Sequence, residues 1–168
     1  MERVAADVPL TASELKVRLL WLLPEFGLQP FGVKNLGAAL AEYRPSVGRV
    51  LYLDDLSDEE WVAGVIHEFG HVSLHPSGSD SYEQHLDDGP EECIVHNAAM
   101  LVCAAFGMYK YVDLLRARGV PERLLAPVPP ALQRIVYSMV EWIEAAIRDP
   151  ENPPARIDHL STEIDHAS

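Results

Sequence analysis

The chain is poor in positive charge and in cysteine. Its 168 residues include only 13 Lys and Arg against 26 Asp and Glu, so the formal net charge is -13. This charge would repel a phosphate backbone, and direct nucleic-acid binding is therefore not expected. The only two cysteines, Cys93 and Cys103, are predicted to lie on different faces of one helix, too far apart for a disulfide bond. Both are expected to remain reduced.

Long hydrophobic runs are also missing. No apolar stretch approaches the ~18 residues that a membrane-spanning helix needs, and the opening MERVAADVPL lacks the basic start and apolar core of a secretory signal. We therefore expect a cytoplasmic protein without membrane association. Hydrophobic residues make up 48% and charged residues 23% of the chain, which is typical of globular domains and excludes collagen, coiled coils and wholesale disorder.

The length favours one compact domain. We place it at residues 1–148, and we expect an extended or mobile tail at 149–168, which contains three prolines. The segment 48–54 is rich in strand formers and predicts a strand. Apolar periodicity predicts helices, so the expected class is α+β, mostly helical with a small sheet. The expected helices cover 11–23, a short segment at 36–43, 58–74, a segment from 91 through a buried run at 98–109, 111–118 and 129–147.

One motif carries most of the chemical information. The segment 67–71 reads HEFGH, an HExxH sequence inside the predicted helix 58–74. Four residues rotate a helix by ~400°, so His67 and His71 project from one face and can bind one zinc ion. Glu68 is turned by ~100° from His67, where a carboxylate can accept a proton from zinc-bound water. The alternative is a core helix whose two histidines are satisfied by internal hydrogen bonds.

A catalytic zinc ion usually has three protein ligands, so a third is required. The extended metzincin motif is excluded, because Leu74 and Ser77 stand where that motif needs Gly and His. An acidic ligand from the following helix is the alternative, and Glu92 at the start of that helix is preferred. The competing ligands are Glu91, His75, His96, Asp87 and Asp88, and a minor hypothesis adds Cys93.

Three further residues invite a functional interpretation. Tyr82 and His85 lie in the polar loop between the two metal helices and could donate a hydrogen bond to a developing oxyanion, although ordinary loop residues are the simpler interpretation. Gly70, beside His71, would let a substrate or strand pass close to the helix, or would permit tight helix packing.

Part of the chain resembles the ImmA/IrrE metallopeptidases. The resemblance covers residues 49 to 102 and rests on RVLYL at 49–53, on VIHEFGHVSLH at 65–75, and on Glu92 entering a helix with AAML at 98–101. It implies a zincin-like domain of the gluzincin type, with Zn²⁺ held by the two histidines and an acidic ligand. The chain departs from the family where Glu92-Cys93-Ile94 replaces the usual Glu-Ala-Asn, and where His96 replaces a common aromatic residue.

The expected function is zinc-dependent hydrolysis of a peptide bond in a specific intracellular protein. The resemblance implies a helix-turn-helix repressor, a DNA-binding protein, as the substrate. The alternatives are a non-hydrolytic zinc-containing binding or regulatory module, and a metalloenzyme with other chemistry on the same scaffold. The intact Glu68 favours catalysis, because a structural zinc site needs no base and is usually closed by four protein ligands.

Overall fold

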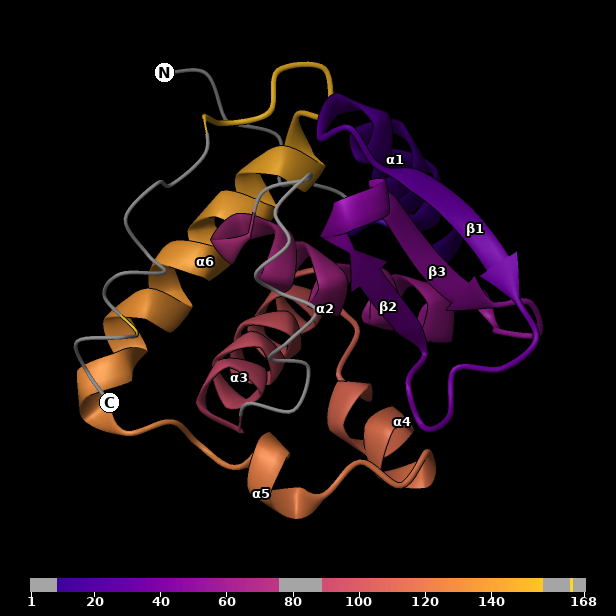
Figure 1. The fold of residues 1–168 in the computed structure, drawn as a ribbon. Coiled ribbons are helices and arrows are strands. Elements are labelled where there is room, and N and C mark those ends of the chain that lie inside the picture. The colour runs from indigo at the N-terminus through magenta and orange to yellow at the C-terminus, as the bar shows by residue number, and fades with distance from the viewer. Residues whose placement is uncertain (1–8, 76–88, 156–163, 165–168) are drawn as a thin grey trace.

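The computed structural model describes residues 9–75, 89–155 and Ile164. These residues form six α-helices and a three-stranded sheet, which confirms the expected α+β class (Figure 1). None of the helices in this part of the chain has the length and apolar character needed to cross a bilayer. In chain order, the elements are α1 (Ala12–Glu25), β1 (Gln29–Val33), β2 (Ala41–Arg44), a 3₁₀ turn (Pro45–Val47), β3 (Arg49–Leu53), α2 (Asp58–Leu74), α3 (Gly89–Ala105), α4 (Tyr111–Ala117), α5 (Glu122–Leu125) and α6 (Pro130–Arg148).

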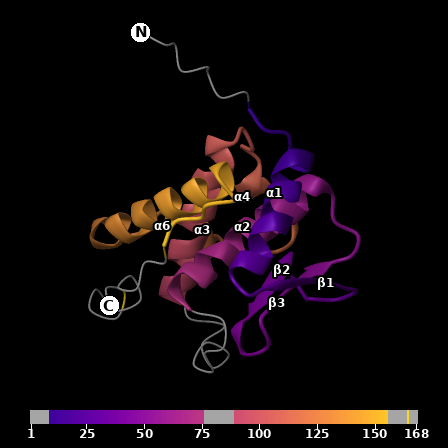
Figure 2. The same ribbon diagram turned by 90° about the horizontal axis from the view of Figure 1, so that it is seen from above.

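Helix α2 is the central element and carries the HExxH motif. It begins at a capping box in which the Ser57 hydroxyl accepts a hydrogen bond from the Glu60 N–H at 3.2 Å, and the Glu60 carboxylate accepts one from the Ser57 N–H at 3.0 Å. Figures 1 and 2 place the sheet on one side of α2 and α6 on the other. The helix contacts α1, α3, α6, β2 and β3, so its rotation about its own axis is fixed by packing on several sides.

The sheet has the order β1-β3-β2, with β1 parallel and β2 antiparallel to β3. Strand β2 is therefore an edge strand, and it packs against α2. The close approach depends on Gly64 of α2, because a Cβ at this position would lie only 2.9 Å from the Cβ of Leu40. A second glycine, Gly48, turns the chain from β2 into β3 with a φ of 61°.

The structure corrects the prediction of a helix at 36–43. Residues 37–38 form a turn, and β2 begins at Ala41. Along β2, Ala41 and Tyr43 are buried while Arg44 is exposed, the alternation of a half-buried strand. Strand β1 was not predicted, because Pro30 and Gly32 interrupt any local strand signal. It forms through its register with β3, a non-local pairing.

Helices α1, α2, α4 and α6 form at the predicted segments, although α1 continues past its predicted end to Glu25 with Pro24 inside it. The short helix α5 was not predicted. Helix α3 differs at one end. The predicted helix from residue 91 does not extend to 109: α3 ends at Ala105, Gly107 follows with a φ of 85°, and Tyr109 is 80% exposed. Beyond α6, the carbonyl of Ala155 accepts a hydrogen bond from the Trp142 indole at 3.1 Å, and Ile164 is buried. The remainder of the predicted tail lies outside the described residues.

Candidate metal centre

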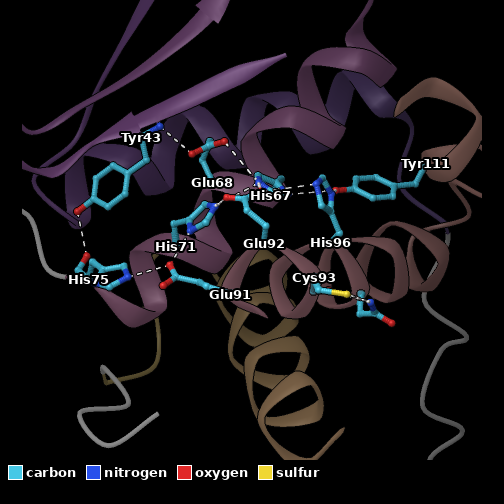
Figure 3. Close-up of polar contacts among 11 residues, drawn as sticks. Tyr43, His67, Glu68, His71, His75, Glu91, Glu92, Cys93, His96 and Tyr111 are labelled. Atoms are coloured by element: carbon cyan, nitrogen blue, oxygen red, sulfur yellow. Dashed lines mark hydrogen bonds and ion pairs between the residues drawn. The ribbon is translucent and has the colours of Figure 1, made fainter. Parts of the chain in front are cut away.

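The three preferred ligands come together between two packed helices. His67 and His71 lie one turn apart on α2, and Glu92 lies in the first turn of α3 (Figure 3). Their side chains form a group that could hold a metal ion. The sequence placed these residues correctly on two helices, and only the packing of α3 on α2 brings them to one point.

The spacing of the ligand atoms fits a single ion. The Nε2 atoms of His67 and His71 are 3.2 Å apart. The Glu92 carboxylate oxygens lie 2.8 Å from Nε2 of His71 and 3.4 Å from Nε2 of His67. Ligands ~2.0 to 2.1 Å from one ion in a tetrahedron stand about 3.3 Å apart, so the observed separations need little adjustment.

The pKa of His71 is shifted strongly by its surroundings. Its side chain is nearly fully buried, which by itself would lower its pKa, but hydrogen bonds to Glu91 and Glu92 outweigh burial and raise the pKa to about 10. Burial would raise the pKa of Glu92, but the charge of His67 and hydrogen bonds to His67 and His71 hold it well below its usual range. A metal ion would replace the proton that these groups share in its absence.

Glu91 and His75 lie behind the ligands. The Nδ1 of His71 is 2.9 Å from Oε1 of Glu91, and the Nε2 of His75 is 2.8 Å from the same oxygen. Burial acts to raise the pKa of Glu91, but its two histidine partners lower it to about 2, so it is a carboxylate at neutral pH. Glu91 therefore orients the ring of His71. In this arrangement neither Glu91 nor His75 belongs to the ligand group.

Glu68 lies beside the ligands and outside their group. The backbone N–H of Tyr43 in β2 donates a 2.7 Å hydrogen bond to Oε2 of Glu68, and Oε1 is 3.9 Å from Nε2 of His67. The side chain is 5% exposed. This burial raises its pKa, although the neighbouring histidines oppose the shift.

The opposite side of His67 is occupied by His96 and Tyr111. The Tyr111 hydroxyl is 3.3 Å from Nδ1 of His67 and 2.9 Å from Nδ1 of His96. Burial, helped by the charge of His67, lowers the pKa of His96 to about 3. No motif pointed to Tyr111, which lies on α4. The sequence contained one indication that Tyr111 is buried: it lies four residues before Leu115, and the two share the buried face of that helix.

A cleft of about 350 Å³ opens over this group. Residues 38–42 line it, and so do Leu115, Val120 and Leu124 from the segment that includes α4 and α5. His67, Glu68, His71, Glu92 and His96 line its interior. The sheet thus borders the cleft as expected, but through edge strand β2 rather than the predicted strand β3.

Other predicted residues lie elsewhere. The thiol of Cys93 points away from the ligands, 3.3 Å from the carbonyl of Ala126, so the hypothesis of a Cys93 ligand is wrong (Figure 3). Cys93 and Cys103 are both free thiols, as expected. Gly70 faces no cleft: a Cβ there would lie 2.7 Å from Val95, so tight helix packing explains it. The remaining candidates, Tyr82, His85, Asp87 and Asp88, lie outside the described residues.

No protein-family model matches the chain, and no curated protein or solved structure matches it significantly.

Proposed function

We propose that the chain is a zinc-dependent endopeptidase with a zincin-like domain, similar to the ImmA/IrrE metallopeptidases. His67, His71 and Glu92 would hold the ion, since two imidazoles and one carboxylate suit zinc and leave a coordination position open. When bound, zinc polarises a carbonyl oxygen and makes water more acidic. Metal-site geometry alone would also suit a structural ion, so the observation that carries the proposal is the position of Glu68.

The position and the raised pKa of the Glu68 carboxyl both support a role as general base. Tyr43 fixes Oε2 through its backbone N–H, which leaves Oε1 on the side of His67 to accept a proton. Burial raises the pKa of this carboxyl toward the range in which a base works well at neutral pH. Glu68 takes a proton from the attacking water, holds it while the peptide C–N bond breaks, and passes it to the leaving amine nitrogen.

The open cleft supports hydrolysis over a structural role. A structural zinc site is normally closed by four protein ligands, whereas this group faces a cleft of about 350 Å³. Strand β2 lines the cleft through Ala41 and Glu42, and Leu115, Arg123 and Leu124 line it as well. A peptide segment lying in this cleft would bring a backbone carbonyl next to Glu68.

The charge of the chain supports a basic protein substrate. A net charge of -13 attracts cationic partners and speeds their capture. Helix-turn-helix repressors are commonly basic, and the family resemblance points to the same class. The proposed substrate is therefore a DNA-binding regulator with an accessible extended segment.

The decisive experiment compares the zinc-loaded protein with its Glu68→Gln variant. Each is incubated with candidate repressors from the same genome neighbourhood, and fragments are identified by mass spectrometry. We expect one or a few cuts by the parent protein and none by the variant, with equal zinc content in both. Stable complexes with both forms and cleavage by neither would favour the non-hydrolytic binding module instead.

A further inference from the structure

On the side of His67, the ligand group is connected to a buried hydrogen-bond network formed by Tyr111 and His96. The Tyr111 hydroxyl bridges Nδ1 of His67, at 3.3 Å, and Nδ1 of His96, at 2.9 Å (Figure 3). The rings of His67 and His96 are in contact, with their centres 4.3 Å apart and their planes tilted by 41°. Tyr111 is 2% and His96 6% exposed, so protein groups rather than bulk water must satisfy these polar atoms.

The number of hydrogens available on the two imidazoles and the hydroxyl determines which atom donates each hydrogen bond in this network. The Nε2 of His67 faces His71 and Glu92, so Nε2 is the ligating atom and needs its lone pair. A neutral imidazole then carries its hydrogen on Nδ1 and donates it to the Tyr111 oxygen. The buried tyrosine hydroxyl has one hydrogen that also needs an acceptor, and Nδ1 of His96, at 2.9 Å, can accept it. His96 must therefore carry its own hydrogen on Nε2.

We propose that Tyr111 and His96 are positioning residues of the metal centre. Tyr111 orients the ring of His67 and fixes the tautomer of His96, whose Nε2–H is presented to the carboxylate of Glu92. The Nε2 atom is 3.6 Å from Oε2 of Glu92, beyond a full hydrogen bond, so this interaction is mainly electrostatic. His96 also lines the cleft, so it lies beside the space in which a substrate would bind.

The arrangement gives each histidine ligand its own support. Glu91 holds Nδ1 of His71, and Tyr111 holds Nδ1 of His67. Partners of this kind set both the orientation and the tautomer of a ligating imidazole. The inference rests on the metal-binding part of the proposed function and is independent of peptide hydrolysis.

The test is nitrogen NMR of the histidine side chains in ¹⁵N-labelled, zinc-loaded protein, because protonated and unprotonated ring nitrogens have distinct shifts. Signals of His96 are assigned with a His96→Asn variant. We expect His96 to be protonated on Nε2 alone and His67 on Nδ1 alone. In Tyr111→Phe, His96 should become a mixture of tautomers, and the zinc dissociation constant should rise by ~10- to 100-fold.

The matched control is Tyr52→Phe, which removes a tyrosine hydroxyl from β3, where the ring packs on Trp61. It should change neither the His96 tautomer nor the zinc affinity. If the parent protein itself carries a hydrogen on Nδ1 of His96, the proposed assignment of hydrogens in the network is wrong, and no variant is needed to show this. Unchanged zinc affinity in a folded Tyr111→Phe protein would overturn the positioning role.

The outcomes also separate this inference from the proposed function. A parent protein that binds no zinc would overturn both. Zinc binding without hydrolysis of any substrate would contradict only the proposed endopeptidase.

Discussion

The backbone N–H of Tyr43 donates a 2.7 Å hydrogen bond to Oε2 of Glu68, which joins edge strand β2 to helix α2. The contact is reached because Gly64, one helical turn before Glu68, has no side chain to hold Leu40 and Ala41 away. Glu68 thus satisfies a buried backbone donor of the sheet in addition to its proposed role as a base.

This double role predicts that two substitutions of Glu68 differ in their effect on stability. Glu68→Ala leaves the Tyr43 N–H without its acceptor and should lower the free energy of unfolding by about 1–3 kcal/mol. Glu68→Gln keeps a carbonyl oxygen for that bond and should unfold close to the parent, while hydrolysis falls by ~10² or more. Urea unfolding of the metal-free proteins measures the difference. Equal losses for both variants would show that the hydrogen bond contributes nothing.

The ligand group predicts how metal binding responds along one face of α2. His67→Ala and His71→Ala each remove one of three protein ligands and should abolish or greatly weaken binding of about one zinc per chain. His75→Ala is the control one turn further on, where a hydrogen bond to Glu91 is lost and no member of the ligand group is removed. The His75→Ala variant should weaken zinc binding by no more than about tenfold. Competition with a chromophoric chelator gives the affinities, and full occupancy in both ligand variants would rule out the site.

The raised pKa of His71 predicts opposite effects of pH on metal binding and on stability. In the metal-free protein this pKa is about 10, so the imidazole is protonated at neutral pH and must lose its proton when the ion binds. Zinc affinity should therefore rise with pH. Because the folded pKa lies above the ordinary 6.5, protonated His71 stabilises the metal-free fold fully below pH 6.5, and this stabilisation is lost as pH rises toward 10.

Calorimetry in buffers of different protonation enthalpy measures the proton release, and urea unfolding between pH 6.5 and 10 measures the stability. In His71→Ala the decline in stability over this range should be smaller. Zinc binding without proton release at pH 7 would contradict the assignment of a protonated His71.

The elements predicted correctly are those whose signals are local. Ser57 and Glu60 lie three residues apart and begin α2 together, and the spacing of His67 and His71 is itself one helical turn. Strand β1 and the edge strand β2 depend instead on pairing with β3 across the sheet. Residues 36–43 have a helix-like composition, but burial of Ala41 and Tyr43 against α2 selects a strand.

In the candidate site, too, local sequence signals predicted some residues, whereas others depend on contacts between distant segments. The Glu92 position followed from the requirement for a third ligand and from the start of the next helix. Glu91 was considered only as a competing ligand, because a sequence does not show which of two adjacent carboxylates faces the ion. Tyr111 was missed because the packing of α4 beside α3 brings its hydroxyl to His67.

Gly70 provides a test of the packing that holds the two ligand helices together. A Cβ at this position would lie 2.7 Å from Val95 of α3 and 3.2 Å from the Met139 sulfur of α6. Gly70→Ala should therefore destabilise the fold by about 1–3 kcal/mol through overpacking, despite the better helix propensity of alanine. At Gly89, in α3, no atom lies within 4 Å of such a Cβ, so Gly89→Ala should stay within about 0.5 kcal/mol of the parent. Thermal unfolding compares them, and equal stability of the two variants would show that α3 tolerates a displacement from α2.

The acidic charge predicts how a substrate is captured. Capture of a basic repressor by a chain with a net charge of -13 is assisted by long-range attraction, which salt screens over about 10 Å at 0.1 M ionic strength. The association rate with the zinc-loaded Glu68→Gln variant, which should bind the substrate without cutting it, should therefore fall as salt rises, while the dissociation rate changes less. Surface plasmon resonance at several salt concentrations separates the two rates. An association rate independent of salt would remove net charge as a basis for substrate choice. Recognition would then depend on the shape of the cleft and on its apolar lining residues, which include Leu115 and Leu124.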